Sequence, residues 1–241
     1  MKNAEPKMKH DVHKTLGAVR TLMCTLLLML CATGLTSCKE EDNTVEEFPN
    51  WQASNDAYFQ QLYNEATAEV AAGNTGWKVL RNWSLPEDSE RFTASAADHV
   101  VVRVLKDGQS TTPSPLYTDT VRVSYIGRVL PSKSYPEGKV FDNHMGDSFN
   151  EQTSITVDMA VASNVTGFIT AIMNMHVGDY WRVYIPYQLG YDKNAIKDDN
   201  KNELAPAYST LVFDIYLKGY YHPGGKLPSV QSKAFTGWIE E

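Results

Sequence analysis

Five segments after residue 98 carry the residue pattern of β-strands, and this pattern restricts the fold more than any other feature of the sequence. Each is rich in β-branched and aromatic residues, and most alternate apolar with polar positions, as strands with one buried face do. Turn signals such as Pro113-Ser114-Pro115 separate them. The segments are residues 100–105, 121–125, 155–159, 181–185 and 211–217.

A single short helix is expected between the third and fourth of these segments. Phe168, Ile172 and Met175 recur at helical spacing and would form one apolar stripe. Ser163 or Asn164 is the expected N-cap. One amphipathic helix among antiparallel strands predicts an α+β domain in which the sheet wraps on that helix.

A second helix is expected before the strands, as an N-terminal extension. Ser54 can cap its start and Gly73-Asn74 can end it. Trp77 and Trp83 follow in a stretch without clear periodicity, and we expect them to pack the extension onto the sheet. The apolar residues predicted to share one face of this helix are Tyr58, Leu62, Ala66 and Val70.

The composition allows a packed core and disfavours a nucleic-acid partner. Hydrophobic residues make up 42% of the 241 residues, which is enough apolar material for a folded domain. The formal net charge is −7, whereas proteins that bind phosphate backbones normally present a basic face. We therefore expect no nucleic-acid partner.

The first 37 residues have the layout of a secretory leader. Five lysine and arginine residues precede an uncharged apolar run at residues 22–35, which is short for a membrane span of about 20 residues. The run ends in Leu35-Thr36-Ser37-Cys38, which resembles the bacterial lipobox, whose cysteine receives diacylglycerol. We expect cleavage before Cys38 and lipid anchoring through it, with a leader that ends near an unrelated cysteine as the alternative.

An acidic, polar tether is expected from Cys38 to residue 50. Its Lys39-Glu40-Glu41-Asp42 segment resembles those of surface-exported lipoproteins in Bacteroidetes, although a plain solvated tether fits the same residues. The expected location is the cell envelope, at the outer membrane, on its periplasmic or outer face. Cys24 and Cys31 lie in the leader, so no thiol remains for a disulfide or a metal site.

Five consecutive motifs in the strand region resemble the FKBP-type peptidyl-prolyl cis-trans isomerase family. Each motif alone is a weak signal, but five in the right order are specific. The resemblance covers residues 98–220 and implies the family's fold and its activity on X-Pro bonds, with no cofactor and no metal. The motifs are Val121–Gly127 with Gly138–Asp142, Val165–Phe168, Met175–Asp179, Ile185–Tyr191 and Ala205–Asp214.

The resemblance also implies which residues line a substrate pocket. A purely structural role remains open for Val165 and Phe213. Residues matching catalytic positions are Tyr125, Phe141, Asp142, Phe168, Tyr191 and Phe213, and those matching substrate-binding positions are Ile155, Val165 and Ala205.

Three positions depart from the family pattern. Phe168 stands where tryptophan is common, Ile155 replaces an aromatic residue, and Asp192 replaces a glycine. The polar segment from Asp192 to Pro206 is also longer than the usual flap. We expect these departures to alter the catalytic rate and not the fold.

Rotation about an X-Pro bond requires neither a nucleophile nor a metal. Its barrier is about 18–20 kcal/mol because amide resonance must be broken. The twisted amide is less polar than the planar one, so an apolar aromatic pocket stabilises it relative to water. The expected partners are proline-containing segments of exported proteins. We expect the protein to be a monomer, with or without additional chaperone action. The alternative is a binding module with little turnover.

Two patterns in the sequence resemble metal-binding sites but lack residues or spacing that such sites require. Asp192, Asn194 and Glu203 match three positions of a calcium-loop template, but Ile196 and Lys197 break it. The four histidines after residue 98 lack the spacing of metal ligands.

These observations together predict the organisation of the chain. We expect a leader at 1–37, a tether at 38–50, a helical extension at 51–97, an isomerase domain at 98–220 and a tail at 221–241.

Overall fold

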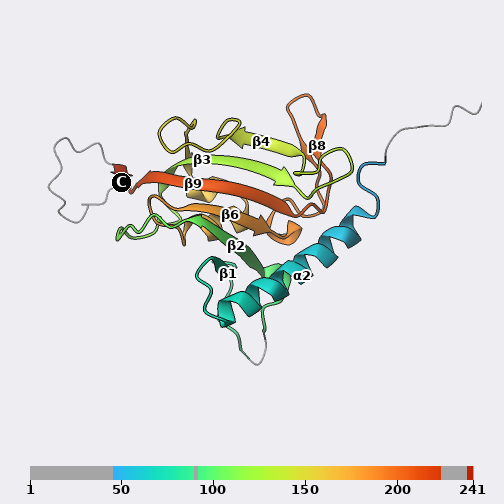
Figure 1. The fold of residues 1–241 in the computed structure, drawn as a ribbon, viewed down its shortest axis with the longest axis horizontal. Coiled ribbons are helices and arrows are strands. Elements are labelled where there is room, and N and C mark those ends of the chain that lie inside the picture. The colour runs from blue at the N-terminus through green and yellow to red at the C-terminus, as the bar shows by residue number, and fades with distance from the viewer. Residues whose placement is uncertain (1–45, 90–91, 224–237, 241) are drawn as a thin grey trace, which may run out of the picture. The chain divides into compact units, whose positions relative to one another are not determined.

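An antiparallel sheet of eight strands dominates the described part of the computed structural model, which comprises residues 46–89, 92–223 and 238–240 (Figure 1). The main path of the sheet is β1-β2-β6-β9-β3-β4, with β10 paired to β9 and β5 paired to β3. The strands are β1 Trp77–Arg81, β2 His99–Lys106, β3 Thr120–Val129, β4 Val140–His144, β5 Val157–Ala160, β6 Tyr180–Ile185, β9 Leu211–Tyr221 and β10 Trp238–Glu240.

A separate two-stranded hairpin forms within the long polar segment after Tyr191. It consists of β7, Ile196–Lys197, and β8, Glu203–Ala205. Short 3-10 helices occur at η1 Ala96–Asp98, η2 Val161–Ser163 and η3 Tyr187–Leu189.

The short helix α3, Thr166–Ile172, packs on one face of the sheet and forms the main core with it. All residues from Gly167 to Ile172 are buried, because strands β2, β6 and β9 cover the helix with valine and isoleucine side chains. The predicted α+β class, with the sheet wrapped on a short helix, is confirmed.

The predicted cap of α3 is wrong. Val165 occupies the N-cap position and provides no capping side chain. Ser163 ends η2, and the Asn164 side chain donates hydrogen bonds to the carbonyls of Ala160 and Val161 instead.

The N-terminal helix α2, Trp51–Ala71, packs against β1 and β2 on the opposite face of the sheet (Figure 1). Val101 contacts this helix, whereas its neighbours Val100 and Val102 face the α3 core, because successive strand residues point to opposite faces. A hydrogen bond of 2.8 Å from Trp51 Nε1 to Ser209 Oγ also ties the helix to the segment before β9.

Helix α2 begins earlier and buries a different face than predicted. Asn50, not Ser54, is the N-cap, while Tyr58 and Val70 are exposed. A strict spacing of four residues drifts around a helix of 3.6 residues per turn, so the buried stripe mixes spacings of three and four. Its members are Asn55, Phe59, Leu62 and Ala66.

The two tryptophans after α2 have different environments. Trp77 is not in an irregular stretch but begins β1, and it packs against α2 as expected. Trp83 instead stacks on Tyr117, with ring centroids 4.7 Å apart, and stays partly exposed.

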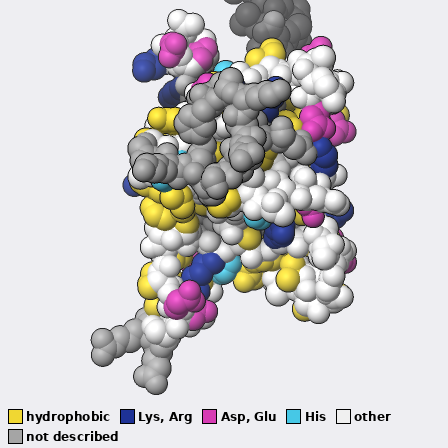
Figure 2. Space-filling view, turned by 90° about the vertical axis from the view of Figure 1, so that its left-hand side faces the viewer, with side chains coloured by type: hydrophobic (Ala, Val, Ile, Leu, Met, Phe, Trp, Pro, Cys, Tyr) yellow, Lys and Arg dark blue, Asp and Glu magenta, His cyan; other side chains and the backbone are white. Residues whose placement is uncertain are grey.

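Some of the predicted segments lie outside the described residues. They are the leader, Cys38 and the tether as far as residue 45, together with residues 224–237 and 241 of the tail. Where the structure describes the chain, it contains no helix of the length and apolar character that crossing a bilayer requires. Acidic and basic side chains are interspersed on the face drawn in Figure 2, with small groups of hydrophobic side chains between them.

Candidate functional site

Four aromatic rings from four different elements meet at one end of the α3 core. They are Tyr125 from β3, Phe141 from β4, Phe168 from α3 and Phe213 from β9. Phe213 is central, with ring centroids 5.9 Å from Tyr125, 5.5 Å from Phe141 and 5.3 Å from Phe168. The contacts are edge-to-face, an arrangement that aromatic quadrupoles favour.

Gly127 makes room for two of these rings. It pairs with Phe213 in the register of β3 and β9. A Cβ atom at this position would lie 2.6 Å from Cε1 of Phe213 and 2.8 Å from Cζ of Phe141, which is closer than side chains pack. Gly127 belongs to the first motif that resembles the family. Its role in leaving space for the two rings follows from the strand pairing, so the sequence alone did not reveal it.

A carboxylate organises the polar edge of this aromatic cluster. The Tyr125 hydroxyl donates a hydrogen bond of 2.7 Å to Oδ2 of Asp142. Burial, followed by this hydrogen bond, raises the pKa of Tyr125, so the phenol remains a donor. His144 Nε2 lies 3.4 Å from Oδ1 of the same carboxylate. Sequence reasoning considered this histidine only as a metal ligand, and the alternation of β4 could have placed it beside Asp142.

Tyr191 and Val165 supply free hydrogen-bond donors. Within the described residues, no group is hydrogen-bonded to the Tyr191 hydroxyl or accepts from the Val165 amide. Tyr191 is 40% exposed, and burial together with the charge of Asp142 raises its pKa, so the hydroxyl stays protonated. Val165 itself packs against the core at the start of α3.

The remaining two predicted site residues lie in contrasting environments. Ile155 precedes β5 and is 62% exposed, and its carbonyl accepts a hydrogen bond of 2.6 Å from Ser124 Oγ. Ala205 is fully buried in β8, where it pairs with Ile196. Its side chain is therefore not available to a substrate in this structure.

Asp192, which replaces a family glycine, adopts a left-handed backbone conformation. Its φ is 54°, in the region that glycine prefers and that aspartate tolerates better than most residues. Its carbonyl accepts a hydrogen bond of 2.9 Å from the Tyr208 amide. The substitution thus keeps the turn after Tyr191.

An aromatic cluster with donors at its edge is set between one short helix and an antiparallel sheet, which is the arrangement that the resemblance to FKBP-type isomerases implies. Residues 112–218 match the family described as FKBP-type peptidyl-prolyl cis-trans isomerase. It is 30% identical over 115 residues to the FKBP-type 22 kDa peptidyl-prolyl cis-trans isomerase of Escherichia coli (strain K12), which is 48% of this chain and 47% of that protein. The chain thus spans about half the length of this curated relative.

Solved structures are also similar. A peptidyl-prolyl cis-trans isomerase from Pseudomonas syringae pv. tomato has 23% identity and a TM-score of 0.45, over 69% of this chain and 92% of that one. FkpA from Escherichia coli has 19% identity and a TM-score of 0.44, over 90% of this chain and 73% of that one.

Proposed function

We propose that this protein is a peptidyl-prolyl cis-trans isomerase that acts on X-Pro bonds of exported proteins. The observation that carries the proposal is the cluster of Tyr125, Phe141, Phe168 and Phe213, with unpaired donors of Tyr191 and Val165 nearby. The family match over residues 112–218 supports it.

The chemistry follows from the polarity of the twisted amide. The proline ring would contact Phe168 and Phe213, whose apolar surroundings favour the twisted form over the more polar planar form. The Tyr191 hydroxyl and the Val165 amide would hold substrate carbonyls in place. Asp142 would keep the Tyr125 hydroxyl oriented, and no proton is transferred in the reaction.

The test is an X-Pro isomerisation assay on the full chain. We expect faster cis/trans exchange of a proline-containing peptide than in buffer alone. An exchange rate equal to the uncatalysed rate at micromolar protein would contradict the isomerase. Saturable binding of the same peptide without rate enhancement would then identify the binding module, for which the exposed Ile155 at a family aromatic position is the specific observation.

Tyr191→Phe should lower isomerase activity several-fold and leave the melting temperature near wild type. The hydroxyl has no partner among the described residues, so only a substrate bond worth about 0.5–1.5 kcal/mol would be lost. Tyr220→Phe is the matched control, because its buried hydroxyl donates to the Pro113 carbonyl at 2.9 Å. This control should lower stability and spare activity. The reverse outcome would make Tyr191 a structural residue.

We further propose that the protein is a lipoprotein anchored to the outer membrane through Cys38, on its periplasmic or outer face. The basic residues, the apolar run at 22–35 and Leu35-Thr36-Ser37-Cys38 support this. Cys38→Ala should abolish labelling with radioactive fatty acid and release the protein from membranes. The matched control is Cys31→Ala, which should still be labelled. Persistent labelling of the Cys38 variant would refute the anchor.

A further inference from the structure

A pocket of about 230 Å³ lies on the sheet face opposite α3. Arg128 and Arg182 line it together with Tyr58 from α2 and Pro131 from the loop between β3 and β4. Arg128 directly follows Gly127, which faces the aromatic cluster, and successive strand residues point to opposite faces. This pocket is therefore separated from the aromatic cluster by the sheet.

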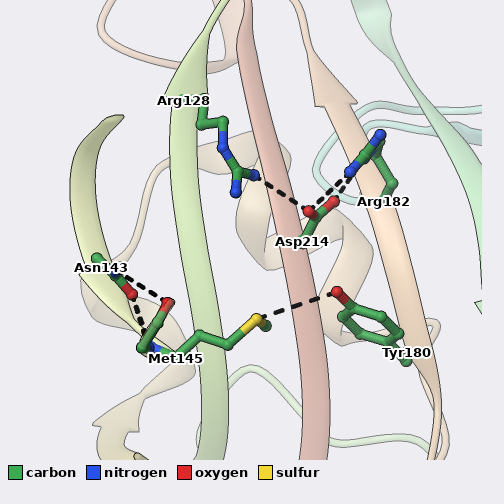
Figure 3. Close-up of polar contacts among 7 residues, drawn as sticks. Arg128, Asn143, Met145, Tyr180, Arg182 and Asp214 are labelled. Atoms are coloured by element: carbon green, nitrogen blue, oxygen red, sulfur yellow. Dashed lines mark hydrogen bonds and ion pairs between the residues drawn. The ribbon is translucent and has the colours of Figure 1, made fainter. Parts of the chain in front are cut away.

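Arg128 and Arg182 form an ion-pair cluster with a single carboxylate, that of Asp214, so this cluster carries one positive charge in excess. Asp214 is 4% exposed and lies between the two arginines (Figure 3). Its carboxylate accepts bonds of 2.6 and 2.9 Å from Nε and Nη2 of Arg182, and one of 3.1 Å from Nη1 of Arg128. Two guanidinium groups thus share one carboxylate. Arg103 pairs with Arg182 in the register of β2 and β6, but its guanidinium lies over the Trp77 ring, 4.1 Å from the ring centroid, and does not line the pocket.

One carboxylate, that of Glu137, lines the pocket. Glu137 is exposed, and it forms no ion pair with Arg128 or Arg182. Nη1 of Arg182 and Nη2 of Arg128 have no carboxylate partner among the described residues. These nitrogens remain available to a planar oxyanion, which guanidinium groups bind through paired hydrogen bonds.

The walls indicate what kind of molecule carries the anion. The pocket also has apolar surface beside the cations, provided by Tyr58, Tyr184 and Pro131. Apolar side chains that flank an acidic residue in a bound peptide can contact this surface. Burial, together with the neighbouring Tyr184, raises the pKa of Tyr58 to about 12, so its hydroxyl stays neutral and can donate to a carboxylate.

We propose that this pocket binds the side-chain carboxylate of an acidic residue in a partner polypeptide. The site is independent of the isomerase site, and a client held there would stay near the domain while its proline bonds isomerise at the aromatic cluster.

The probe is a short, proline-free peptide with blocked ends and a central Leu-Glu-Leu sequence, titrated into the full chain by calorimetry. We expect binding that weakens about tenfold when glutamine replaces the glutamate, because a charged hydrogen bond is lost. Arg128→Gln should weaken binding of the glutamate peptide by about the same factor. Arg182 still pairs with Asp214 in that variant, so the buried carboxylate remains neutralised. Isomerisation of an X-Pro peptide should be unchanged.

Two further variants make the test specific. Glu137→Gln should strengthen binding several-fold, because it removes a carboxylate that repels the ligand. Lys218→Gln removes the same charge as Arg128→Gln outside the pocket lining, and should have little effect. Equal losses for Lys218→Gln and Arg128→Gln, or equal affinity for the glutamate and glutamine peptides, would overturn the proposal. Tighter binding of inorganic phosphate than of the glutamate peptide would also overturn it.

Discussion

Ile172→Ala should destabilise the protein by about 2–5 kcal/mol, the largest effect we expect from a single truncation. Ile172 is fully buried in α3, within the core that the helix forms with the sheet. Its replacement removes apolar surface and leaves a cavity that the surrounding strands can fill only in part. Urea unfolding followed by tryptophan fluorescence measures the change.

Val70→Ala is the matched control for this prediction. Val70 lies on α2 and is 44% exposed, so its truncation should change the unfolding free energy by less than about 0.5 kcal/mol. Below its melting range, the folded fraction of the Ile172→Ala variant should have the same isomerase activity as the wild type, because no ring of the aromatic cluster is removed. Similar unfolding free energies for the two variants would show that α3 is not the centre of the core.

Gly127→Ala should impair both the stability and the isomerase activity. The added methyl group would overlap Phe213 and Phe141, whose nearest atoms would lie 2.6 and 2.8 Å away. Overpacking of this kind costs about 1–3 kcal/mol, and here the rings that must move belong to the proposed site. We expect the activity of the folded protein to fall by roughly tenfold or more, since displaced rings no longer fit the proline.

Gly76→Ala tests whether this effect is specific to the site. The nearest atom to an added Cβ there is Oδ1 of the exposed Asn74 side chain, at 3.1 Å, and the backbone has no positive φ. This variant should keep full activity. If Gly127→Ala is as active as Gly76→Ala, the rings of Phe141 and Phe213 do not form the substrate site.

Local patterns were sufficient to predict the class of fold and most of its elements. Strands β2, β3, β6 and β9 include the predicted segments, because β-branched residues and alternation reflect the environment of each strand directly. The predicted segment at 155–159 is shifted, since β5 begins at Val157 and leaves Ile155 exposed. The motif order predicted the rings of Tyr125, Phe141, Phe168 and Phe213, which the structure brings together.

The sequence by itself thus determined the strand content, the short helix α3 and the residues of the aromatic cluster. Only the tertiary structure determined which face α2 buries and that Arg128 and Arg182 meet at Asp214. It also gave the reason why position 127 must lack a side chain. Arg128 and Asp214 are 86 residues apart in the chain and become neighbours through the pairing of β3 with β9. Periodicity describes the two faces of each strand, but strand order and register determine which residues of different strands share a site.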